Sequence, residues 1–226
     1  MKNPILLLHG ALGSKEQFEF LQQKLSLESE VFIIDFEGHG KSISQTDFSI
    51  QLFTQNIIDF LKEKKLSKVD IFGYSMGCYV ALYLALNHPD LVGKIITLVT
   101  KFEWTPTFAE KEIKMLNPVV MKLKVPAFAR RLEELHGAKN WENVVLKSAK
   151  MMVNLGENPN LNEANYERIN HKVLICLGEL DSMSTQKESK NVANYLQNGH
   201  FLEINNLKHP IESVPIDKIA SIITNF

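Results

Sequence analysis

The chain has 226 residues, 45% of them hydrophobic and 23% charged, which is the composition of a globular domain and not of a disordered chain. Lys and Arg number 25 against 26 Asp and Glu, so the net charge of −1 offers no basic field for nucleic acid or an anionic membrane. The longest apolar run, residues 79–86, is too short to span a bilayer, and the first apolar stretch is too short for a secretory signal. Cys78 and Cys176 lie in apolar runs, which predicts reduced core residues of a cytoplasmic protein.

Six short apolar runs have the length and composition of β-strands. They are Ile5–Leu8, Val31–Ile34, Val69–Phe72, Ile95–Val99, Val173–Leu177 and Phe201–Ile204. These runs are apolar almost throughout, which is typical of parallel strands covered on both faces. Segments with helical spacing separate them, so the pattern predicts a doubly wound α/β fold with a mostly parallel sheet.

Helical spacing is clear in the segments between these runs. Apolar positions recur helically at residues 50–61, Met76–Leu86, Gln186–Leu196 and Ile216–Thr224. Ser14 and Gln17 have the spacing of a capping box, which predicts a further helix containing Phe18, Leu21 and Leu25.

One long segment interrupts this alternation. Residues 103–170 contain no strand-like run, and their helical patches are broken by several prolines and glycines. A structureless loop of this length would be unusual in a compact domain. We expect a helical cap, here called the insertion, on a core formed by residues 1–102 and 171–226.

The expected chemistry starts at Gly73-Tyr74-Ser75-Met76-Gly77, which follows one predicted strand and opens a helix. A serine on such a tight strand-to-helix turn is exposed as a nucleophile, and glycines two residues before and after it allow close backbone approach. The amino end of the following helix favours a developing oxyanion.

A serine nucleophile needs a general base, and histidine is the side chain that titrates near neutrality. Among seven histidines, His209 alone lies in a loop after the carboxyl end of a predicted strand, the edge where ligands bind in open parallel sheets. Asp181 meets the same criterion as the acid that orients the histidine, with Glu179 as a rival.

These motifs resemble the α/β-hydrolase superfamily over nearly the whole chain. Leu8-His9-Gly10-Ala11 is similar to the family's oxyanion loop, residues 35–42 to its Asp-x-x-Gly-His-Gly-x-Ser turn, and Ser75, Asp181 and His209 occur in the family's chain order. Glu37 stands where many relatives have proline. Because the first strand begins at residue 5, we expect the family's amino-terminal hairpin to be missing, which leaves about six strands.

The resemblance also indicates the rest of the site. The backbone N–H groups of Ala11 and Met76 are the expected oxyanion donors, with Leu12 as the alternative to Ala11. Five side chains are candidates for the substrate pocket: Leu12, Tyr79, Trp104, Met115 and Met151. No metal-binding or nucleotide-binding spacing occurs, so we expect neither a metal nor a cofactor.

The favoured function is a serine hydrolase that cleaves a small, uncharged carboxylic ester or thioester through an acyl-enzyme, with a small acyl compound as its partner. A cofactor-free lyase or C–C hydrolase with the same triad remains an alternative. The menaquinone-pathway enzyme that eliminates pyruvate is similar in the segment Leu8–Ser14, but it carries an arginine where this chain has Tyr79. A hydrolase-like receptor without turnover is the third possibility. The natural acyl group and the oligomeric state stay open at this point.

Overall fold

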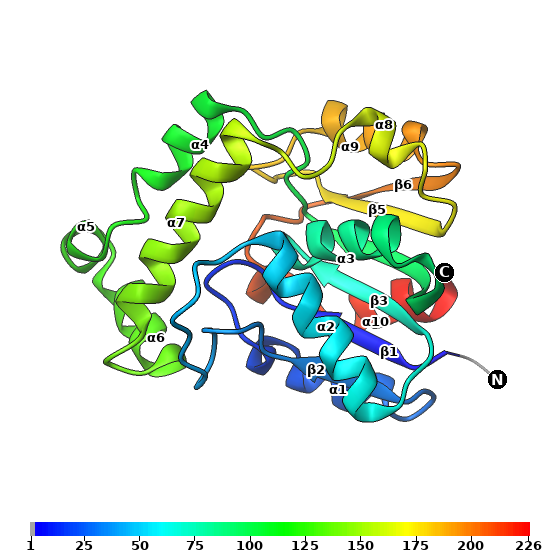
Figure 1. Ribbon diagram of the computed structural model, residues 1–226, viewed down its shortest axis with the longest axis horizontal. Helices are drawn as coiled ribbons and strands as arrows, with labels where there is room; N and C mark the ends of the chain where they lie inside the picture. The colour runs from blue at the N-terminus through cyan, green and yellow to red at the C-terminus, as the bar shows by residue number, and fades with distance from the viewer. Residues whose placement is uncertain (1–2) are drawn as a thin grey trace.

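The computed structural model describes residues 3–226 and is built around one six-stranded sheet (Figure 1). The strands are β1 (Ile5–Leu8), β2 (Val31–Ile34), β3 (Val69–Tyr74), β4 (Val92–Leu98), β5 (Lys172–Gly178) and β6 (Asn198–Ile204). Their spatial order is β2-β1-β3-β4-β5-β6, and every neighbouring pair is parallel. The predicted parallel α/β fold is therefore confirmed.

The helices fill the connections between the strands. They are η1 (Lys15–Phe18), α1 (Glu19–Leu25), α2 (Ile50–Lys64), α3 (Met76–Asn87), η2 (Pro89–Leu91), α4 (Pro106–Ile113), α5 (Pro118–Lys124), α6 (Pro126–His136), α7 (Trp141–Glu157), α8 (Glu163–Tyr166), α9 (Gln186–Tyr195), η3 (Ile211–Ser213) and α10 (Ile216–Asn225). None of them, within residues 3–226, is long and apolar enough to cross a bilayer.

The side chains of successive strand residues pack alternately into two hydrophobic cores, one on each face of the sheet. Leu6 and Leu8 of β1 pack in the core under α2, α3 and α9, whereas Ile5 and Leu7 pack in the core under α1 and α10. This two-sided burial explains why the strand sequences are continuously apolar.

The predicted capping box before α1 is wrong. Ser14 Oγ accepts a hydrogen bond from the backbone N–H of Glu16 at 3.3 Å, and the chain starts as a 3-10 turn. The Gln17 side chain donates instead to Glu212, 3.1 Å away near the carboxyl terminus. The Gln17 side chain thus makes a long-range hydrogen bond in place of the local capping bond that the Ser14–Gln17 spacing predicted.

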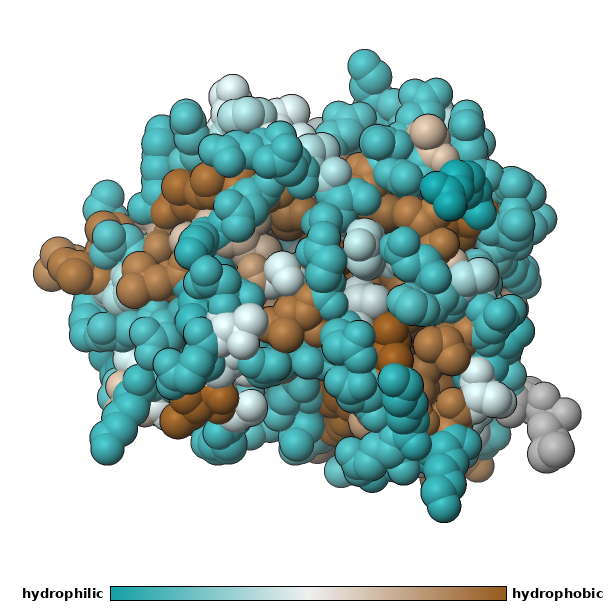
Figure 2. Space-filling model, viewed as in Figure 1, coloured by the Kyte–Doolittle hydropathy of each residue, from teal (hydrophilic) through white to brown (hydrophobic). Residues whose placement is uncertain are grey.

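The insertion between β4 and β5 contains the five helices α4 to α8. Helices α4 to α7 lie at the end of the sheet toward which β3 runs, whereas α8 lies beside α9 (Figure 1). Figure 2 shows apolar side chains at its outer edge, over α5, where Val119 and Leu123 are exposed. The side chain of Asn140 donates to the carbonyls of Gly38 and Ser42 at 2.9 and 3.1 Å. The Gly-His-Gly turn is therefore a platform on which the insertion is fixed.

Candidate active site

The order of the strands reverses between β1 and β3, because the chain runs outward from β1 to β2 and then returns to β3. In open parallel sheets such a reversal leaves a crevice at the carboxyl ends of the two strands, where ligands bind. Gly10 and Ala11 follow β1 at this point, and Ser75 follows β3. The fold alone therefore brings the predicted oxyanion loop beside the predicted nucleophile.

Ser75 lies on the tight turn between β3 and α3, with φ 50 and ψ −115. A left-handed backbone is costly for a residue with a side chain and requires support from its surroundings. That support comes from its N–H, which donates to the Leu98 carbonyl of β4 at 2.9 Å. A Cβ at Gly77 would lie 2.4 Å from the Leu8 carbonyl oxygen, and one at Gly73 would lie 2.5 Å from the Cys78 nitrogen. Both glycines of the motif are thus required for packing.

The turn after β1 is held by His9. Its Nδ1 lies 2.8 Å from the Gly10 carbonyl, and its Nε2 accepts the N–H of Phe36 at 3.1 Å. Leu12 has φ 60, and the Gly13 N–H closes the turn onto the Gly10 carbonyl at 3.1 Å. Met76 is the first residue of α3, so its N–H belongs to the amides that have no partner inside the helix.

Asp181 and His209 form a partly buried pair in the loops after β5 and β6. His209 Nδ1 lies 2.8 Å from Asp181 Oδ2, while Asp181 Oδ1 accepts the backbone N–H groups of Met183 and Ser184 at 2.7 and 2.8 Å. Burial acts to raise the pKa of Asp181, but the hydrogen bond and charge of His209 and the two amides outweigh it, so the pKa lies below its ordinary value. Asp181 is therefore held as a carboxylate that fixes the imidazole. The rival Glu179 accepts the N–H of Asn206 instead.

The imidazole of His209 lies against Tyr74, the residue before Ser75, with the ring centroids 5.8 Å apart. Among residues 3–226, the Ser75 hydroxyl and His209 Nε2 are not hydrogen-bonded to each other. Such catalytic hydrogen bonds are often long without a substrate and shorten when one binds. All three predicted triad residues nevertheless lie at one edge of the sheet.

Two cavities meet at Ala11. The first is narrow, with a volume of about 30 Å³. It is lined by Ala11, Ile50, Ser75, Met76, Tyr79, Lys101, Trp104, Met151, Met152, Leu155 and Met183. The second, on the side of His209, is lined by Ala11, Leu12, Gly13, Gln17, Tyr74, Phe128, Arg131, Leu132, Leu135, His209, Pro210 and Glu212. The first cavity is the acyl-pocket candidate, because it contains Ser75 in a mostly apolar wall.

The predicted pocket residues divide between these places. Tyr79, Trp104 and Met151 line the Ser75 cavity, and Leu12 lines the His209 cavity. The prediction that Met115 lines the pocket is wrong. Met115 lies in the turn after α4, is 41% exposed and lines neither cavity. A methionine at a helix end is not constrained to face the core, so its apolar character alone was a poor guide.

The sequence interpretation missed two residues at the site. Lys101 lines the Ser75 cavity, and His136 of α6 bridges the loops beside it. His136 Nδ1 accepts the Gly40 N–H at 3.0 Å, while Nε2 lies 3.0 Å from the Leu12 carbonyl. Lys101 follows the carboxyl end of β4, so the criterion that selected Asp181 and His209 could have found it. No local signal marked His136.

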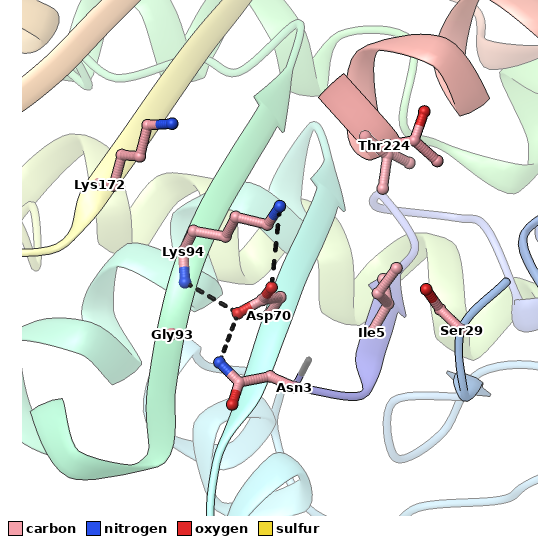
Figure 3. Close-up of a pocket in the computed structure, with 9 residues that line it drawn as sticks. Asn3, Ile5, Ser29, Asp70, Gly93, Lys94, Lys172 and Thr224 are labelled. Carbon is pink, nitrogen blue, oxygen red and sulfur yellow. Dashed lines mark hydrogen bonds and ion pairs between the residues drawn. The ribbon is translucent and has the colours of Figure 1, made fainter. Parts of the chain in front are cut away.

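A larger cavity, about 420 Å³, opens at the opposite end of the sheet, beside the amino ends of β1 and β4 (Figure 3). Its Asp70 carboxylate accepts the Asn3 side chain at 2.8 Å and the Lys94 N–H at 3.1 Å, and the Lys94 ammonium lies 3.9 Å away. These polar groups satisfy one another, and Ser75 lies at the other end of β3. The smaller cavity, which contains Ser75, is therefore the better candidate for an active site.

Comparison with known proteins agrees with this fold. The sequence profile of the alpha/beta hydrolase fold matches residues 3–211. A "Probable alcohol acetyltransferase" of Cyberlindnera fabianii is 39% identical over 93 residues, 40% of this chain, and the chain spans only 25% of that protein.

Two solved structures share the fold at low sequence identity. The enol-lactonase from Burkholderia xenovorans LB400 has a TM-score of 0.80 at 15% identity, covering 100% of this chain and 91% of that one. Est816, described as an N-acyl homoserine lactone degrading enzyme, has a TM-score of 0.80 at 18% identity, covering 100% and 93%. Since the profile spans nearly the whole chain and the fold agrees throughout, the chain belongs to the alpha/beta hydrolase family.

Proposed function

We propose that this protein is a serine hydrolase that cleaves a small carboxylic ester or thioester through an acyl-enzyme. The observation that carries the proposal is Ser75 on its strained turn beside a fixed Asp181–His209 pair. A structural serine would need neither the left-handed backbone nor a fixed carboxylate–imidazole pair at the carboxyl end of the same sheet.

In the proposed reaction, His209 Nε2 takes the proton of Ser75 Oγ while Oγ attacks the acyl carbon. The N–H groups of Ala11 and Met76 stabilise the tetrahedral oxyanion. His209 then gives the proton to the leaving alcohol or thiol, which leaves the acyl-enzyme. Water attacks this ester, its proton passes to His209 and back to Ser75 Oγ, and the carboxylic acid departs.

Hydrolysis is favoured over elimination from a polycarboxylate because the cationic side chains at the site are already neutralised. Arg131 lines the His209 cavity, but its guanidinium lies 2.6 Å from the Glu212 carboxylate. Lys101 in the Ser75 cavity contacts Glu188. A substrate with several carboxylates would stay unpaired in a low-dielectric cavity, which is strongly unfavourable.

The proposal is tested by fluorophosphonate labelling together with stopped-flow hydrolysis of p-nitrophenyl acetate and butanoate. We expect one covalent label per chain and a burst of p-nitrophenol that equals the enzyme concentration, as an acyl-enzyme requires. The menaquinone-pathway elimination is assayed on the same preparation. Efficient elimination without labelling or a burst would contradict the proposal.

The acetyltransferase relative suggests one addition to this experiment. An alcohol that reaches the acyl-enzyme would receive the acyl group in place of water, with no change in the first half of the reaction. Adding ethanol to the p-nitrophenyl acetate assay therefore measures the partition between ethyl acetate and acetate. Ethyl acetate as the main product at millimolar ethanol would make the protein an acyltransferase with the same nucleophile.

The insertion is expected to set the length of the acyl group through Met151, which is buried and lines the Ser75 cavity. Met151→Ala removes several heavy atoms from the wall and makes room for two or three methylenes. At about 0.8 kcal/mol each, this should raise the hexanoate-to-acetate ratio of kcat/KM roughly 15- to 60-fold. The ratio is measured with p-nitrophenyl esters.

Met115→Ala is the matched control, because Met115 lies on the same insertion but outside both cavities. It should leave the hexanoate-to-acetate ratio unchanged. Equal ratios in the wild type and in both variants would place Met151 in packing only and would remove the insertion from the specificity determinants.

A further inference from the structure

Lys101 is an unexpected side chain in the Ser75 cavity. It lies just after β4, its side chain is only 10% exposed, and its neighbours in the cavity wall are methionine, leucine and tryptophan side chains. The hydroxyl oxygen of Tyr79, in the same wall, accepts the Leu161 N–H at 2.9 Å. Lys101 is the charged side chain among the lining residues.

The charge of Lys101 is balanced by Glu188 of α9, whose side chain is 1% exposed. One oxygen of Glu188 contacts the ammonium and accepts the Thr185 hydroxyl at 3.2 Å, and the other accepts the Phe102 N–H at 3.1 Å. The Phe108 ring lies 4.3 Å from the ammonium. Thr185, Phe102 and Phe108 thus fix the pair where it borders the cavity.

Fixing two charges in an apolar wall is costly, and an apolar pair of similar volume is often as stable or more stable. Packing therefore does not account for the lysine. An ammonium has three N–H donors, and the Glu188 carboxylate is its one hydrogen-bond acceptor among the described residues. Donor capacity remains for an oxygen atom of a bound ligand.

The charge balance of the Lys101–Glu188 pair decides whether the ligand oxygen belongs to a carboxylate or to an uncharged carbonyl group. A carboxylate would add a net negative charge to a closed, neutral cavity and would compete with Glu188 for the ammonium. An uncharged carbonyl oxygen gains a charge-assisted hydrogen bond and leaves the Lys101–Glu188 pair intact. We propose that Lys101 makes the site selective for acyl groups that carry a second, uncharged keto oxygen along the chain. The inference rests on the proposed function, since it names the acyl class for the Ser75 site.

The test compares three ethyl esters of nearly equal shape: 4-oxopentanoate with its keto group, 4-methylpentanoate with a methyl branch in place of the oxygen, and hydrogen succinate with a carboxylate. We expect wild-type kcat/KM for the keto ester to exceed that for the methyl ester about tenfold, with the carboxylate poorest. Preference for the carboxylate would overturn the proposal.

The variants are Lys101→Met and the double variant Lys101→Met/Glu188→Gln. The double variant keeps the cavity neutral if the single one is unstable because Glu188 stays buried and unpaired. Both should lose the keto preference, so that the ratio of kcat/KM for the keto ester to that for the methyl ester falls to about one. Lys190→Met is the control, because Lys190 is exposed outside the cavity and should keep the preference. An unchanged keto preference in a folded double variant would overturn the proposal.

A binding measurement separates this inference from the proposed function. In Ser75→Ala no acyl-enzyme can form, so dissociation constants of the three esters are read from tryptophan fluorescence, with Trp104 in the cavity wall. The keto ester should bind about tenfold more tightly than the methyl ester, and adding Lys101→Met should remove the difference. If wild type hydrolyses none of the esters but this difference is found, the hydrolase proposal fails and the role of Lys101 stands. Equal binding of the keto and methyl esters overturns the role of Lys101.

Discussion

Replacing Ser75 by alanine is expected to abolish fluorophosphonate labelling and to lower kcat for p-nitrophenyl butanoate about 10⁴- to 10⁶-fold, because serine hydrolases lose activity of this order with their nucleophile. The fold should be unaffected. The Ser75 side chain makes no capping bond to α3, and its N–H, which donates to Leu98, is retained. The free energy of unfolding in urea should therefore change by less than about 1 kcal/mol.

Ser26→Ala is the matched control, since Ser26 is exposed at the end of α1. It should be labelled and should hydrolyse esters like the wild type. A Ser75→Ala protein that keeps more than a few per cent of activity would show that another group attacks the substrate. A variant that loses activity because it unfolds would be recognised by its urea transition.

The sheet was largely predictable because its strands are buried on both faces. Ile5–Leu8 and Val31–Ile34 agree with the structure at both ends. The edge strand β6 begins at Asn198, ahead of the predicted Phe201, because pairing with β5 joins backbones whatever the side chains are. Its first three residues, Asn198, Gly199 and His200, carried no apolar signal.

The predicted site residues were found by position at strand ends, and this criterion depends only on the order of elements along the chain. It brings Ser75, Asp181 and His209 to one edge, although their joint action stays a prediction. The pocket was less predictable because its wall depends on how the insertion is rotated about the sheet. Met115 and Met151 look alike in sequence, and only Met151 lines the cavity.

Three buried histidines give the second large expected effect. His9, His39 and His136 form a cluster, with ring centroids 5.0 Å apart between the first two and 5.8 Å between the last two. Burial lowers the pKa of His9 from 6.5 to about 4, although a hydrogen bond to Gly10 and the charge of Asp35 oppose it. Burial also lowers the pKa of His39 well below its ordinary value and lowers that of His136, which lies near Asp35 and Lys41.

These directions fix how stability depends on pH. Between about pH 4 and 6.5 the unfolded chain binds a proton at His9 and the folded chain does not, so stability present above pH 6.5 is lost as the pH falls. The lowered pKa values of His39 and His136 act in the same direction. The pKa shift of His9 alone corresponds to about 3 kcal/mol of folding free energy.

The free energy of unfolding, measured in urea from pH 7.5 to 4.0, should decline steeply. His39→Phe removes one titrating group from an aromatic cluster and should flatten it, whereas replacing the exposed His200 by Asn should not.

Protonation of these histidines should also disturb the active site at a pH where the chain as a whole is still folded. The Nδ1 of His136 accepts the Gly40 N–H, so a protonated ring would place two donors against each other and release α6 from the turn that contains Gly40. We expect acid to inactivate the enzyme reversibly at a pH where the urea transition still shows a folded core. His136→Asn should lower activity already at pH 7.5, because the shorter amide cannot reach both loops. If activity in acid falls only together with global unfolding, His136 is not the group that holds the insertion over Ser75.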